Sequence, residues 1–332
     1  MLHIFKPPFS QSSGSDILGV STLKAFRVAG LDPQCADLWP DAIAGMFNSG
    51  RIPFGRTLFR KAIAPHFARR HLAPLGNGDT AWILGNMVPL DSNAEPESHL
   101  KKQGAKYIFH VMDNWFAQPF LREGVLRRCK LADCLIVPTP QLATTIQEEG
   151  ITTPVLRLEE PIDVRRLQPL PVTCDLIDPT IVWCGNPNNV HHLNKTVGLL
   201  NRVHKEKPFI LKIISNTRPQ EGFGFAGKVL WLRYNYTNEA GLLAGARAGL
   251  APLEDTPYNR CKGAYKIKTY LAAGVPVVAS RVGYQENLLR SGNAGILVQD
   301  DSQWFDAILH LLKDDLAYRQ MANCAREVAV SE

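Results

Sequence analysis

The sequence predicts an α/β protein made of two doubly wound, Rossmann-like domains. Short apolar runs alternate along the whole chain with segments of helical periodicity, which is the pattern of parallel sheets covered by helices. A length of 332 residues is enough for two domains of ordinary size, each with its own core. Residues 161–180, between the two series of strands, are rich in proline and have no helical period. We therefore expect a first domain over residues 1–165 and a second over 166–310.

Eleven apolar runs are predicted strands, five before the proline-rich stretch and six after it. The first five are Leu2–Phe5, Ala81–Leu84, Lys106–Val111, Cys134–Val137 and Val155–Leu158. The other six are Thr180–Cys184, Phe209–Ile214, Val229–Leu232, Gly249–Pro252, Val275–Ala279 and Ile296–Val298. The stretch from Trp304 to Val330 is predicted to be helical and amphipathic.

Composition excludes several classes of protein. A hydrophobic content of 45% and a charged content of 20% are those of a soluble globular protein. The seven cysteines are scattered and form no C-x-x-C pair, which argues against a disulfide framework or a zinc site and indicates a reducing cytoplasm. The N-terminus has no signal-peptide pattern, and no apolar run is long enough to span a membrane. A net charge of +6 favours anionic partners.

The stretch from Leu250 to Ser280 carries the strongest functional signal. A strand ends at Pro252, a turn-rich loop follows, and a short helix is predicted over Ala264–Ala273, ended by Gly274. Three cations lie in this region: Arg260, Lys262 and Lys266. Cations near the N–H groups and dipole of a helix start make a good anion site. A solvated, lysine-rich turn would have the same local composition.

The runs PLEDTPYNRCKGAYK and YLAAGVPVVAS, with VGYQENLLRSGNAGILVQDDSQW after them, resemble the donor-binding half of family-four-type retaining glycosyltransferases. The resemblance is to bacterial members, is specific from Pro252 to Trp304, and is weaker back to about Tyr107. It implies the GT-B fold, with two Rossmann-like domains facing a central cleft and a C-terminal helix, residues 311–332, that crosses back to the first domain. It also implies transfer of a sugar, with retention, from a nucleotide-sugar donor to a saccharide, lipid-linked or other hydroxyl acceptor, as in polysaccharide biosynthesis.

The resemblance implies that Lys262 and Lys266 contact the donor phosphates, with Arg260 beside them and Tyr258 lining the same loop. The chain has no D-x-D motif, and its acid pairs at Asp300–Asp301 and Asp314–Asp315 are typical of helix ends. A departing diphosphate needs either a metal held by carboxylates or fixed cations. We therefore expect no metal and no cofactor, with the nucleotide sugar bound as a substrate.

A second segment that could bind the donor phosphates follows the predicted strand Thr180–Cys184. Gly185 would allow close backbone approach, and Asn186 and Asn188 offer amides to phosphate or sugar. Lys195 is a weaker counterpart of a family lysine on the following helix.

His191 and His192 suggest a metal site at first sight. Neighbouring residues of a helix point about 100° apart, so we do not expect both to bind one ion. In the segment that resembles the family's base-recognition region, Trp231, Tyr234 or Tyr236 could stack on a base or belong to the core.

The first domain offers weaker candidates. Gly14 lies in a loop after the first predicted strand, at the place where GT-B enzymes approach sugar or phosphate. His110 and Asp113 follow a strand end, so Asp113 could orient the acceptor hydroxyl or accept its proton, and His110 could contact the sugar. The alternative is a helix-capping aspartate and a core histidine.

One departure from the family pattern keeps other functions open. The usual E-x7-E pair, whose second glutamate holds the donor ribose, is replaced by Cys261 and Thr269. Thr269 can make one hydrogen bond there, and Glu254 or Asp255 could supply a carboxylate by another route. A catalytically weak GT-B subunit that binds a partner, or a sugar-nucleotide epimerase of the same fold, are the alternatives.

The segment from Arg51 to His71 contains six lysines and arginines and no acid, with apolar residues between them. This pattern favours an interfacial helix on an anionic membrane surface, although a solvated helix face would look the same. No nucleic-acid-reading motif accompanies the charge, so we expect no nucleic acid partner. We expect a cytoplasmic protein, either free or peripheral on the inner face of the membrane.

Overall fold

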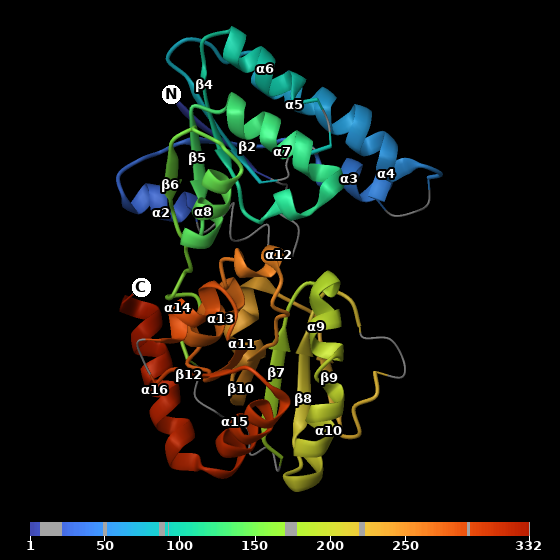
Figure 1. Cartoon of the computed structure of the whole chain (residues 1–332), viewed down its shortest axis with the longest axis vertical. Coiled ribbons are helices and arrows are strands. Elements are labelled where there is room, and N and C mark those ends of the chain that lie inside the picture. Colours follow the sequence, from blue (N-terminus) through green and yellow to red (C-terminus); the bar gives the residue numbers. More distant parts are fainter. Residues whose placement is uncertain are drawn as a thin grey trace. The chain divides into compact units, whose positions relative to one another are not determined.

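The computed structural model describes residues 1–6, 22–48, 52–85, 90–91, 93–169, 178–218, 223–290 and 293–331. Its contacts divide the chain into two compact units, each built around one six-stranded sheet (Figure 1). Unit 1 holds the described residues up to Pro161 together with Arg260–Gly263, and unit 2 holds Ile162–Asn259 and the described residues from Ala264 on.

The sheet of unit 1 is parallel throughout, in the order β2-β1-β3-β4-β5-β6. Its strands are β1 (Leu2–Lys6), β2 (Gln34–Asp37), β3 (Thr80–Leu84), β4 (Lys106–His110), β5 (Cys134–Val137) and β6 (Val155–Arg157). Its α-helices are α2 (Thr22–Val28), α3 (Asp41–Asn48), α4 (Gly55–Leu58), α5 (Ala64–Leu72), α6 (Glu95–Lys102), α7 (Pro119–Leu131) and α8 (Pro140–Glu148). A π-helical turn, η2 (Phe59–Ile63), joins α4 to α5, and a 3₁₀ turn, η3 (Trp115–Ala117), precedes α7.

The sheet of unit 2 is also parallel, in the order β12-β11-β10-β7-β8-β9. Its strands are β7 (Thr180–Cys184), β8 (Ile210–Ile214), β9 (Val229–Leu232), β10 (Ala246–Ala251), β11 (Val277–Ser280) and β12 (Gly295–Val298). Its α-helices are α9 (Val190–Asn194), α10 (Val197–Glu206), α11 (Glu239–Leu243), α12 (Pro257–Arg260), α13 (Tyr265–Ala272), α14 (Tyr284–Arg290), α15 (Asp301–Lys313) and α16 (Asp315–Ser331). Two 3₁₀ turns, η4 (Pro187–Asn189) and η5 (Tyr236–Asn238), follow β7 and β9.

All eleven predicted strands are present within a few residues of their predicted ends, and the predicted fold class is confirmed. The prediction missed β2, whose sequence QCAD is short, polar and mostly exposed because it pairs only with β1 at the edge of the sheet. An apolar run marks strands that are buried on both faces, and an edge strand need not have one.

The two faces of the unit 2 sheet bury separate apolar clusters, which is why its strands are apolar almost throughout. On β7, Ile181 and Trp183 pack with residues of α10 and α15, and Val182 and Cys184 pack with residues of α13 and α16. The described helices therefore cover both faces, as in a doubly wound fold.

The chain's last predicted helix is two helices, α15 and α16, separated at Asp314. The acid pairs lie at helix starts: Asp300 Oδ1 accepts from Gln303 N at 2.9 Å, and Asp314 Oδ1 accepts from Ala317 N at 2.9 Å. Helix α16 packs on α13 and α15 of its own unit. The domain boundaries at 165 and 310 and the crossing of residues 311–332 stay predictions. No helix in the described ranges is both long enough and apolar enough to cross a membrane.

A buried tyrosine fixes the carboxyl ends of β7 and β10. The Tyr270 hydroxyl on α13 accepts from Cys184 N at 2.7 Å and donates to Leu250 O at 3.3 Å. Its ring fits only because Gly249 has no side chain, since a Cβ there would lie 2.5 Å from the ring. One side chain thus joins a helix to two neighbouring strands.

We expect Tyr270→Phe to lower the free energy of unfolding by about 1–3 kcal/mol, because the buried Cys184 N–H loses its acceptor. Urea unfolding followed by circular dichroism measures this loss. Tyr318→Phe, which removes a hydroxyl of the same unit that bridges no strands, is the matched control. Equal stabilities for the two variants would contradict the bridging role.

Candidate functional site

The unit 2 sheet reverses its direction of winding between β10 and β7. The chain runs outward from β7 through β8 to β9 on one side, and from β10 through β11 to β12 on the other. Loops that leave the carboxyl ends of such a pair of strands diverge, and ligands of doubly wound folds bind in the crevice between them. The candidate site of unit 2 is therefore formed by the loops after β7 and β10.

Lys266, Trp183 and Gly185 lie together at this edge. The Lys266 ammonium lies 4.3 Å from the centroid of the Trp183 ring, a cation–π contact. A Cβ at Gly185 would lie 2.7 Å from the Trp183 ring and 3.3 Å from Lys266 Nζ, so glycine keeps this corner open. The prediction that Gly185 and Lys266 belong to one site agrees with this packing, and Trp183 was missed because it reads as an ordinary strand residue.

The start of α13 adds to the positive character of this corner. Its N-cap residue, Ala264, has a left-handed backbone (φ 55°) and no side-chain acceptor for the first turn. Free N–H groups and the positive end of the helix dipole favour an anion at such a position. Lys266, the second residue of the helix, places a cation beside them.

The two predicted asparagines have different surroundings. Asn186 Oδ1 accepts from Asn188 N at 3.0 Å and caps the turn η4, so this oxygen has a local structural role. The Asn188 side chain is exposed.

Thr269 lies inside α13 and is buried, 3% exposed. Its hydroxyl donates to Tyr265 O at 3.1 Å, one helical turn back, so its proton is used within the helix. Its assignment to the ribose stays a prediction.

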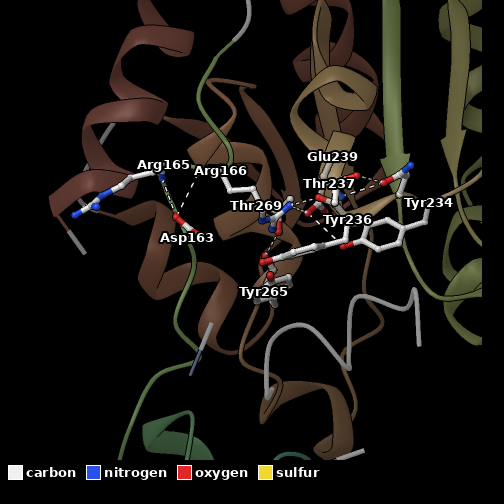
Figure 2. Close-up of polar contacts among 10 residues, drawn as sticks. Asp163, Arg165, Arg166, Tyr234, Tyr236, Thr237, Glu239, Tyr265 and Thr269 are labelled. Carbon is white, nitrogen blue, oxygen red and sulfur yellow. Dashed lines mark hydrogen bonds and ion pairs between the residues drawn. The ribbon is translucent and has the colours of Figure 1, made fainter. Parts of the chain in front are cut away.

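A buried ion pair joins residues 162–167 to the segment after β9. Arg166 donates to Glu239 Oε2 at 2.7 Å and to Tyr236 O at 2.8 Å, and its guanidinium lies 3.9 Å from the centroid of the Tyr236 ring. The Tyr234 hydroxyl lies 3.3 Å from the same glutamate oxygen. Figure 2 shows these side chains converging on Glu239, which is 2% exposed.

Two of the three residues predicted to stack on a base, Tyr234 and Tyr236, belong to this cluster. Arg166 covers one face of the Tyr236 ring, Tyr234 is buried, and Trp231 Nε1 donates to Thr217 O at 3.2 Å. The sequence did not reveal Arg166 or Glu239, because their pairing joins residues far apart in the chain.

The structure brings the rings of the two histidines close together. The ring centroids of His191 and His192 are 3.9 Å apart, because α9 has only five residues and follows directly on the turn η4. Glu254, in the loop after β10, lies close enough that one ligand atom from each of the three residues falls within 4.8 Å of the others. Lys195 forms an ion pair with Glu254, and this contact, as the largest cause, lowers the pKa of the Glu254 carboxyl.

In unit 1, His110 ends β4 and is 4% exposed. Neither of its ring nitrogens has a hydrogen-bond partner among the described residues. Burial lowers the pKa of His110 from 6.5 to about 4, so the ring is neutral near pH 7. A neutral imidazole with two unused nitrogens is suited to hydrogen bonding with a ligand rather than to storing a proton.

Asp113 follows β4 by a few residues and forms an ion pair with Lys262, Nζ to Oδ1 3.5 Å. Both residues lie within unit 1. The capping role falls to the neighbouring Asn114, whose side chain accepts from Ala117 N.

The three predicted cations divide between the units. Arg260 and Lys262 cluster with unit 1, and Lys266 belongs to unit 2. Tyr258 lies on α12 in unit 2. Gly14 lies outside the described residues. The phosphate-binding roles of these residues remain predictions.

Comparison with known proteins agrees with this arrangement. Residues 178–314, which include the loops after β7 and β10, match the family model described as Glycosyl transferases group 1. No curated protein matches the chain.

Several solved structures share the fold over almost the whole chain. Sucrose-phosphate synthase from Thermosynechococcus elongatus is 15% identical, with a TM-score of 0.76 over 99% of this chain and 94% of that one. HepE from Anabaena in complex with UDP-glucose is 14% identical, with a TM-score of 0.70 over 100% and 95%. A trehalose-6-phosphate synthase is 13% identical, with a TM-score of 0.66 over 99% and 95%.

The family match covers residues 178–314, and the fold shared over both units is the GT-B fold of these solved glycosyltransferases.

The depressed pKa of His110 gives a prediction for stability against pH. The unfolded chain takes up a proton on His110 below about pH 6.5 and the folded protein only below about pH 4, so stability is complete above 6.5 and falls between these values. At 1.36 kcal/mol per pKa unit the loss is about 3 kcal/mol. His110→Asn should therefore lose about that much less stability than the wild type between pH 7 and pH 4.

Urea unfolding at a series of pH values measures this difference. His310→Asn, which changes an exposed histidine of unit 2, is the control and should follow the wild type. Parallel curves for wild type and His110→Asn would contradict a neutral, buried His110.

Proposed function

We propose that the protein is a metal-independent, retaining glycosyltransferase that moves a sugar from a nucleoside-diphosphate sugar to a saccharide, lipid-linked or other hydroxyl acceptor. The C1–O bond to the diphosphate breaks, and the acceptor oxygen bonds to C1. The observation that carries the proposal is Lys266 at the start of α13, held beside Gly185 at the carboxyl ends of β7 and β10.

The chemistry needs a group that stabilises the diphosphate as it leaves. A fixed cation and the amino end of a helix supply this stabilisation without reorganising during the reaction. Lys266 is half-buried against Trp183, so its position is set by packing before a donor binds. The absence of a D-x-D motif in the sequence favours this route over a carboxylate-held metal.

Two structural relatives guide the choice of donor and stereochemistry. HepE is seen with UDP-glucose, and trehalose-6-phosphate synthase is described as transferring with retention. We therefore propose a UDP-sugar as the first donor to test. Residues of unit 1 complete the assignment: His110 as a neutral hydrogen-bonding partner of the sugar, and Asp113 as the group that orients the acceptor hydroxyl or accepts its proton.

We expect Lys266→Ala to weaken UDP binding by about tenfold or more, because a charge-assisted contact to phosphate is worth about 1.5–3 kcal/mol. Isothermal titration calorimetry with UDP measures this effect. Lys205→Ala, which removes an exposed lysine from α10 of the same unit, is the control and should bind like the wild type.

Turnover of UDP-glucose, with and without EDTA, completes the experiment. EDTA should leave the rate unchanged, and Lys266→Ala should lower it. UDP binding that is absent in the wild type, or unchanged in Lys266→Ala, would refute the proposed donor site.

We also propose that the basic segment of unit 1 contacts an anionic membrane surface. Phe54, in the turn before α4, is 87% exposed, Leu58 at the end of α4 is 47% exposed, and Lys61 in η2 is also exposed. Two cations of the segment are less available, because Arg60 pairs with Asp91 at 3.2 Å and Arg69 with Glu95 at 2.6 Å. The membrane-facing residues are therefore Phe54, Leu58 and Lys61, and the apolar pair supplies much of the binding.

We expect the double variant Phe54→Ser/Leu58→Ser to lose binding to phosphatidylserine-containing vesicles several-fold, because two exposed apolar side chains no longer insert at the interface. Co-sedimentation with these vesicles and with purely zwitterionic ones measures the loss. Phe120→Ser removes another exposed aromatic of unit 1, 69% exposed, and is the control. Equal sedimentation of both variants with the wild type would exclude this surface.

A further inference from the structure

Two histidines and a glutamate form the one group in the described part of the chain whose side chains could together hold a metal ion. His191 and His192 come from α9, after β7, and Glu254 comes from the loop after β10. One nitrogen of each histidine and one carboxylate oxygen lie within 4.8 Å of one another. In a tetrahedral zinc site, bonds of about 2.0–2.2 Å place such atoms roughly 3.4 Å apart. Small side-chain rotations would therefore close the group around an ion.

A neighbouring contact orients one of the imidazoles. His191 Nδ1 lies 2.8 Å from the carbonyl oxygen of Asn188, so Nδ1 carries the proton and donates it. The other nitrogen, Nε2, then has its lone pair available for a metal. Metal-binding histidines in proteins commonly donate their second N–H to a backbone carbonyl in this way.

The third residue of the group, Glu254, is accessible to solvent and already has a cationic partner. Glu254 already binds one cation, the Lys195 ammonium, which lies on the same side of the sheet at the end of α9. Its side chain is 42% exposed, so an ion from solvent can reach it. A metal ion and Lys195 would compete for this carboxylate.

From this geometry we propose that His191, His192 and Glu254 form a binding site for a divalent transition metal, Zn²⁺ or Ni²⁺, at the winding reversal of the unit 2 sheet. Two imidazoles and one carboxylate select these ions over Mg²⁺, which prefers oxygen ligands. Three protein ligands leave at least one coordination position for water or another ligand. The ion would tie the loop after β7 to the loop after β10, the two loops that border Lys266 and Gly185.

The site goes beyond the proposed glycosyl transfer and does not depend on it. Transfer is proposed to need no metal, and the ion here would join two loops rather than act on the sugar. Binding of the metal alone therefore tests the site, whatever the activity of the protein.

Calorimetric titration with ZnCl₂ and NiCl₂ tests the proposal on the full chain without a histidine tag. Every protein carries Cys35→Ser, because this exposed thiol would bind Zn²⁺ by itself. We expect one site, lost or weakened at least about tenfold in His191→Ala and in Glu254→Gln. His310→Ala, which removes an exposed histidine of the same unit, should bind like the parent.

Lys195→Met provides a readout in the opposite direction. Removing the competing ammonium should tighten Zn²⁺ binding several-fold, and MgCl₂ should give no heat with any variant. The proposal is overturned if the parent binds neither Zn²⁺ nor Ni²⁺, or if His191→Ala and His310→Ala bind alike. Circular dichroism spectra that match the parent show that each variant is folded.

Discussion

The hydroxyl of Tyr270 is the interaction on which the unit 2 site depends. It joins the ends of β7 and β10, the two strands from which the sheet winds in opposite directions, and it belongs to the helix that carries Lys266. The loops on either side of this bridge contain Gly185 and Glu254. Any shift of α13 relative to the two strands would therefore move Lys266 and both loops together. Gly249 is part of the same constraint, because the tyrosine ring occupies the space that a side chain there would need.

Two cations of unit 2, Lys266 and Arg166, are held by different kinds of contact. Trp183 fills the space beside Gly185, and its ring makes a cation–π contact with the Lys266 ammonium. On the other side, Arg166 and Glu239 neutralise each other in a buried pair and fasten residues 162–167 to the segment after β9. Removing one partner of such a pair leaves a buried charge, so the pair tolerates little change. The two corners thus hold their cations by different contacts, an aromatic ring for Lys266 and a carboxylate for Arg166.

How much the sequence could predict depends on the range of the interactions involved. The strands of both sheets follow from local apolar runs, and the exception, β2, is an edge strand that buries little. The end of α13 was predictable because a helix-ending glycine is a local signal. The Arg166–Glu239 pair and the Trp183–Lys266 contact join segments separated by some 70 or more residues, and no local pattern announces them. The closeness of the two histidine rings was missed for a different reason. The argument assumed a regular helix, whereas α9 is a single short turn after η4, where side-chain directions are set by the turn.

The charged residues after β7 and those after β10 contact one another. Glu254, in the loop after β10, lies close to His191 and His192 and forms an ion pair with Lys195. Lys195 was only a weak counterpart of the family's lysine, and a lysine held by a carboxylate is less available to an anion. Lys266, by comparison, lies against the Trp183 ring. If a metal ion took Glu254, Lys195 would lose this partner. The exchange needs no change of fold, since Glu254, Lys195 and the two histidines already lie together at one edge of one sheet.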